Sequence, residues 1–206
     1  MRIIFGLFFV TLLACAAAFL SASTQSQACF AKQLSAQPRP DDVLLAVPED
    51  PATAQTSLPA LDMKIGDFHK IFNRAAQKLK LGLALPALDI EDGEETIIGS
   101  ASLTDAITLV VTADSRNGRV HEIMMVADTG EGGIVTPNVT SCMFTLIAAV
   151  NPEYEASQQH QVLLDLGITD AYIVPEAAEI RRGKVVYWGG WPKGLPLFFG
   201  AEVVEN

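Results

Sequence analysis

Hydrophobic and polar positions divide the chain after residue 63 into a repeated order of helix followed by strands. Apolar residues recur at three- and four-residue spacing over 67–81, which predicts an amphipathic helix. Its stripe consists of Phe68, Ile71, Phe72, Ala75 and Leu79. Asp67 is expected to cap this helix and Gly82 to end it. Alternating and β-branched runs then predict strands at 86–90, 95–101, 106–113 and 119–127.

The last two of these strands are joined by Asn117-Gly118, the strongest short-range signal for a β-hairpin, because both central residues of its turn need positive φ. A second helix is expected to begin at Pro137 and to end at Asn151. A third helix begins at Pro152 and is stopped by Gly167. Strand-like sequence then returns, with strands predicted at 184–188 and 197–204.

Short turns between neighbouring strands predict a mostly antiparallel sheet, and amphipathic helices must bury their stripes against it. We therefore expect an α+β domain with its helices packed on one face. The order of elements, helix then strands and again helices then strands, suggests two related halves. In organisation this resembles helix-on-sheet folds of the cystatin and TATA-binding-protein types, although no sequence repeat supports the resemblance.

The first 28 residues have the layout of a secretory signal peptide. Arg2 precedes an uncharged apolar stretch over 3–20, and small residues follow it. Ser26 and Ala28 predict cleavage before Cys29, with a second possible site before Thr24. Residues 12–15 also resemble the lipobox of bacterial lipoproteins, in which Cys15 would carry the lipid, although the apolar run continues beyond it. A retained membrane anchor is the third alternative, and all three place the domain outside the cytoplasm.

Residues 29–62 hold five of the eleven prolines and lack a helical or strand period, which predicts an extended arm or linker before a single domain at 63–206. The chain has a formal net charge of −10 at pH 7. Such an acidic protein repels phosphate backbones and anionic membranes, so nucleic acid is not an expected partner. Another envelope or secreted protein is compatible with this charge, and a membrane is expected only with a lipidated Cys15 or a retained signal.

Removal of the signal leaves two cysteines, Cys29 and Cys142. In an oxidising compartment a leftover pair suggests a disulfide, which would tie the start of the mature chain to the middle of the domain. The alternative is that Cys142 is a small buried hydrophobic residue and Cys29 is free.

The motif Asp128-Thr129-Gly130 follows an apolar run and resembles the D-T-G of retroviral-type aspartic proteases, in which two aspartates share a proton and activate a water. Asp128 and Glu131 are therefore the candidate catalytic residues. The sequence departs from the family because Glu131 replaces the alanine or serine expected there, and because a single motif would require a dimer. The alternative is a flexible turn after a strand.

No other cofactor, metal or nucleophile signature is found in the sequence. The histidines lack the spacing of a zinc site, and no phosphate-binding glycine loop or G-x-S-x-G occurs. Both tryptophans, Trp188 and Trp191, lie in a Gly/Pro-rich stretch, where aromatic side chains make good binding anchors. The alternative is that Trp188 is core and Trp191 covers the end of the sheet.

These observations favour a non-catalytic binding or accessory protein of the bacterial cell envelope, periplasmic or secreted, over an enzyme. The alternatives are a secreted hydrolase that uses carboxylates in the Asp128 region and a lipid-anchored envelope protein attached through Cys15.

Overall fold

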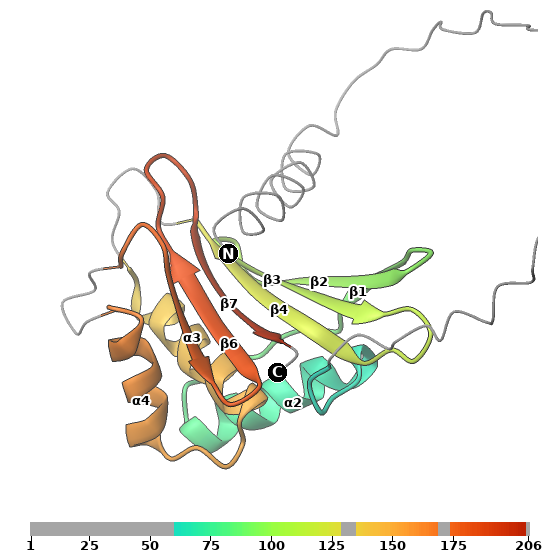
Figure 1. Ribbon diagram of the computed structural model, residues 1–206, viewed down its shortest axis with the longest axis horizontal. Helices are drawn as coiled ribbons and strands as arrows, with labels where there is room; N and C mark the ends of the chain where they lie inside the picture. The colour runs from blue at the N-terminus through green and yellow to red at the C-terminus, as the bar shows by residue number, and fades with distance from the viewer. Residues whose placement is uncertain (1–59, 129–134, 169–173, 205–206) are drawn as a thin grey trace, which may run out of the picture. The chain divides into compact units, whose positions relative to one another are not determined.

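A computed structural model describes residues 60–128, 135–168 and 174–204, and these residues form one seven-stranded antiparallel sheet with helices on one face (Figure 1). The elements before residue 129 are α2 (Ile65–Leu79), β1 (Asp89–Asp92), β2 (Thr96–Thr104), β3 (Ile107–Asp114) and β4 (Val120–Ala127). The later elements are α3 (Pro137–Val150), α4 (Ala156–Asp165), β5 (Ala178–Arg182), β6 (Val185–Gly190) and β7 (Leu197–Val203). The predicted α+β class is confirmed.

The order of strands across the sheet is β1-β2-β3-β4-β7-β6-β5, and every neighbouring pair is antiparallel. The last described strand, β7, thus lies in the interior of the sheet, between β4 and β6. β1–β4 and β5–β7 each occupy one side of the sheet, joined by the β4–β7 pair. That the two sides are related to one another stays a prediction.

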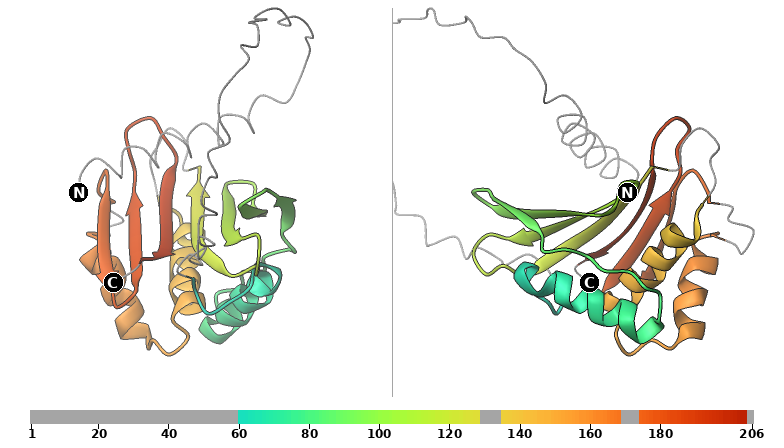
Figure 2. Two further views of the ribbon diagram at one scale, coloured as in Figure 1. Left: turned by 45° about the vertical axis from the view of Figure 1, so that its right-hand side comes forward. Right: turned by 180° about the vertical axis from the view of Figure 1, so that it is seen from behind.

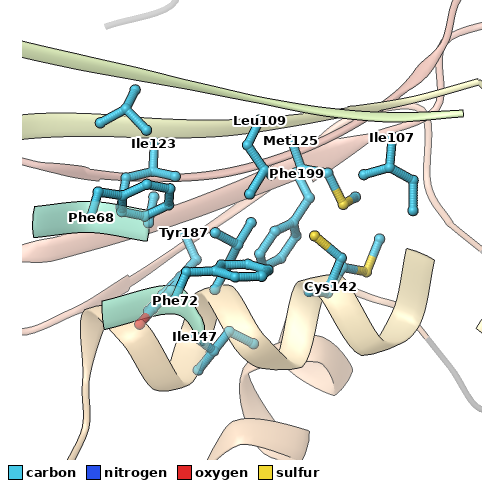
Figure 3. Close-up of a cluster of buried hydrophobic side chains, with 14 of the residues drawn as sticks. Phe68, Phe72, Ile107, Leu109, Ile123, Met125, Cys142, Ile147, Tyr187 and Phe199 are labelled. Atoms are coloured by element: carbon cyan, nitrogen blue, oxygen red, sulfur yellow. The ribbon is translucent and has the colours of Figure 1, made fainter. Parts of the chain in front are cut away.

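Helices α2, α3 and α4 all lie against the same face of the sheet, as the two further views show (Figure 2). Helix α3 is central, because it contacts α2, α4, β4 and β7. The core fills the space between these helices and the sheet (Figure 3). Its largest fully buried side chains include Phe68, Phe72, Ile147, Tyr187 and Phe199.

The first helix is two residues earlier than predicted, and its ends differ in chemistry. Lys64 is the N-cap and makes no side-chain cap bond, while Asp67 lies in the first turn. The C-cap is Lys80, whose φ of 58° is left-handed and whose N–H donates to the carbonyls of Ala76 and Gln77. Gly82 is also left-handed, but it follows the helix end. The prediction that Asp67 caps and Gly82 stops the helix was therefore wrong in detail.

The β3–β4 hairpin is confirmed, but its turn is longer than a two-residue Asn-Gly loop. Only Gly118 has positive φ, and its N–H donates to the Asp114 carbonyl at 2.8 Å. The Asp114 carboxylate accepts from the N–H and the guanidinium of Arg116, and that cation holds the pKa of Asp114 below its usual range. Gly118 and Asp114 thus stabilise the loop through these hydrogen bonds and not through the expected type I′ turn.

Two boundaries elsewhere also moved. The third helix begins at Ala156 rather than at Pro152, because Glu155 forms a capping box with Gln158. The strand predicted at 86–90 begins only at Asp89. Residues 60–64, which span the end of the predicted arm and the start of the predicted domain, lie against β4: Leu61 is buried, and its N–H donates to the Val120 carbonyl at 2.6 Å.

Candidate functional site

The face of the sheet opposite the helices is here called the open face. It carries the strand side chains that point away from the core. Burial alternates along β3 and β6, with fully buried residues toward the helices and partly exposed ones on the other side. The helices of the described residues leave this face uncovered (Figure 2). The centre of the open face includes Ile98, Val110, Thr112, Glu122, Met124, Trp188 and Glu202.

Trp188 lies across its β7 neighbour on the open face. Its Cα partner is Gly200, and a β-carbon added to Gly200 would stand 2.4 Å from Cζ2 and 2.6 Å from Cε2 of the indole. The ring therefore occupies the space that a side chain at position 200 would fill. Gly200 in turn pairs with Met124 of β4, so the indole lies next to the middle of the sheet. Glycine at position 200 is what permits this close approach.

Two glutamates stand directly opposite each other beside this tryptophan. Glu122 of β4 and Glu202 of β7 are Cα partners, and Glu202 is two residues from Gly200 on the same face. Cβ atoms of such cross-strand partners are about 4.5–5.5 Å apart, and like charges there destabilise a sheet. Neither carboxylate has a hydrogen bond or ion pair with another residue of the described ranges.

The environment of both carboxyls disfavours their charged form. Burial, and then the neighbouring charge of Glu202, raises the pKa of Glu122 to about 7. Burial, and then the charge of Glu179 on β5, raises the pKa of Glu202. His121 precedes Glu122 and adds little positive charge, because burial lowers the pKa of its imidazole. Like charge is thus concentrated where Glu122 meets Glu202, and the other Cα partners of this pair are Thr112 and Val186.

This arrangement predicts that the free energy of unfolding falls as pH rises toward the pKa of Glu122. A carboxyl with a folded-state pKa near 7 and an unfolded value near 4.5 binds more protons when folded, so stability is lost between these two pH values. We expect Glu122→Gln to raise the free energy of unfolding by about 2 kcal/mol at pH 8, after allowance for partial solvent screening, and to change it little at pH 4. Urea unfolding at both pH values measures the difference.

Glu91→Gln is the matched control, because Glu91 is exposed on the edge strand β1. It should leave the pH profile unchanged. His121 titrates with the opposite sign, since its lowered pKa makes stability rise with pH, but it is present in both proteins and cancels in the comparison. Equal effects of the two substitutions at pH 8 would contradict the assignment.

The two tryptophans have different environments. Trp191 packs against the core on the helix side of the sheet, and its backbone N–H donates to the Pro175 carbonyl at 2.8 Å. Trp188 lies on the other face, so the alternative that it belongs to the core is wrong. Of the two predicted anchors, Trp188 is therefore placed on a surface where it could contact a ligand.

The candidate catalytic residues are only partly described. Asp128 is exposed just after β4, where its N–H donates to the Ala106 carbonyl at 2.8 Å. Glu131 lies outside the described residues, so their association stays a prediction. No group of three or more histidine, cysteine, aspartate or glutamate side chains within the described ranges could hold a metal ion.

Cys142 on α3 is fully buried and forms no disulfide with another described residue, and burial raises the pKa of its thiol. Cys29 and Cys15 lie outside the described residues, so the disulfide and the lipid attachment stay predictions. The described helices include none long and apolar enough to cross a membrane.

Sequence reasoning did not identify the Glu122–Glu202 pair. Each glutamate interrupts an apolar strand at a position that faces away from the core, which is a common place for a polar residue. Only the pairing of β4 with β7 brings the two together. Comparison of the chain with protein-family models, with curated proteins and with solved structures found no match.

Proposed function

We propose that this chain is a non-catalytic binding protein exported to the bacterial cell envelope, and that its open face binds a basic segment of a partner protein. The observation that carries the proposal is the Glu122–Glu202 pair beside Trp188, for which no described residue supplies a cation. Export is supported by the signal-like first 28 residues.

The apolar component of the open face supports binding rather than mere solubility. Trp188 is partly exposed on Gly200, and Ile98 is 39% exposed two strands from Glu122 in the same lateral row. Aromatic and apolar side chains supply most of the energy of a protein interface when they are covered. Apolar side chains thus lie on the same face as the two charges, where a bound partner would cover them.

Charge complementarity indicates which partner fits. Two carboxylates placed opposite each other repel, and a cation between them would relieve that repulsion. The overall charge of −10 would also attract basic partners over a distance and disfavour acidic ones. A basic protein segment satisfies both the local pair and the long-range field.

The experiment compares two aliphatic residues that are equally exposed but lie on different faces of the domain. Ile98 lies on the open face and Leu164 on α4, and each is 39% exposed. We expect Ile98→Lys to reduce recovery of a cross-linked partner from envelope extract by about tenfold, because it adds a like charge to the basic partner and removes apolar contact. Leu164→Lys should leave recovery at the level of the unmodified chain.

Quantitative mass spectrometry of cross-linked envelope and cytosolic extracts measures the recovery. A partner enriched equally by both variants would exclude the open face as the binding surface. Failure of the unmodified chain to enrich any envelope protein over the cytosolic fraction would contradict the proposed function.

A further inference from the structure

We infer that the group held between Glu122 and Glu202 is the guanidinium of a partner arginine, stacked beside the indole of Trp188. This inference rests on the proposed function, because it names the chemistry by which the open face would recognise its partner. It concerns one side chain of that partner rather than the whole interface.

The position of the glutamates suits a single bridging cation. They are direct cross-strand partners on one face, so their carboxylates reach the same point above the β4–β7 junction. A guanidinium offers five N–H donors in a planar fork and can therefore satisfy two carboxylates at once. An ammonium is a compact point charge and matches this geometry less well.

Trp188 supplies the second half of the arrangement. Its ring lies over Gly200, one same-face position along β7 from Glu202, and remains partly exposed. A guanidinium stacks on an aromatic face as well as bonding to carboxylates, and such contacts strengthen when water is excluded. The glutamates and the indole together select a planar cation.

Charged groups of the molecule itself do not supply this cation within the described ranges. Arg181 stands in the same lateral row on β5, but its Nε donates to the Gly183 carbonyl at 2.9 Å. Arg182 pairs with Asp165 on α4. Glu179 adds a third negative charge near Glu202. Within the part of the chain that the structure describes, the two glutamates are thus left without a cation, and a partner can supply one.

The test uses the two tryptophans as a probe and an internal control. The chain is labelled with 5-fluorotryptophan and titrated with Nα-acetyl-arginine amide while ¹⁹F spectra are recorded. The Trp188 resonance should shift in a saturable manner, and the Trp191 resonance should not, because Trp191 packs on the core. The neutral isostere Nα-acetyl-citrulline amide should cause no shift, and the lysine analogue should bind about tenfold more weakly.

The Glu122→Gln and Glu202→Gln double variant should weaken arginine binding by about tenfold or more, and Glu91→Gln should not. Equal binding of citrulline, equal binding of lysine, or unchanged affinity of the double variant would overturn the inference. Folding of the variants is checked by the unchanged Trp191 resonance. If the chain binds the arginine probe but Ile98→Lys still recovers the partner, the proposed function alone is refuted. If Ile98→Lys loses the partner but the chain does not bind the arginine probe, this inference alone is refuted.

Discussion

Gly200→Ala should lower the free energy of unfolding by about 2–3 kcal/mol and displace Trp188. The added β-carbon would stand 2.4 Å from the indole and 2.8 Å from the Ile123 carbonyl oxygen. The ring can move, but the carbonyl belongs to the β4 backbone in the middle of the sheet. Chemical denaturation measures the loss of stability, and the near-ultraviolet circular dichroism of tryptophan measures the displacement.

The control is Gly66→Ala on α2, where a β-carbon would meet nothing within 4 Å. Because alanine favours a helix over glycine, this substitution should stabilise the domain by about 0.5 kcal/mol. The cost of Gly200→Ala should also be smaller when Trp188→Ala is already present, since one of the two clashes is then gone. Equal costs in both backgrounds would show that the ring does not lie on Gly200.

Phe72→Ala should destabilise the domain by about 3–5 kcal/mol, the largest effect that we expect for one substitution. Phe72 is fully buried on α2, faces the sheet and α3, and lies 6.1 Å from Phe68 between ring centroids (Figure 3). Removal of its ring leaves a cavity that the surrounding strands cannot close. Urea unfolding of the purified variant measures the loss.

Lys70→Ala on the same helix is the comparison, because the Lys70 side chain is 65% exposed and its ion pair with Asp67 at 3.7 Å lies at the surface. Its effect should remain within about 0.5 kcal/mol. A similar cost for both substitutions would mean that α2 does not bury its apolar stripe against the sheet.

The elements that rest on local patterns were predictable from sequence. The stripe of α2 follows the helical period, so Phe68 and Phe72 fall on the buried side as expected. Pro137 opens α3 because its missing N–H is not needed at the first helical position. Helix ends were harder, since Lys80 takes the left-handed conformation where Gly82 was expected.

The candidate site was not predictable for a physical reason. Its charges come from β4 and β7, which the sequence separates widely, and the lateral register of a sheet sets which side chains meet. Trp188 was predicted as a candidate binding anchor, but the face that it occupies is set by the strand alternation of β6. The same alternation sends its neighbour Tyr187 into the core, where the hydroxyl of Tyr187 bonds to Asn151.

The interior position of β7 has a consequence for how the chain assembles during synthesis. Strands β4 and β6 each offer a row of unsatisfied backbone donors and acceptors to β7, and this row is open until residues 197–203 have left the ribosome. Earlier hairpins can form locally, but no strand pairing connects β1–β4 with β5 and β6 until β7 is added. Nascent chains that end before β7 would therefore expose the unpaired edges of β4 and β6. Exposed strand edges of this kind promote aggregation of incomplete chains.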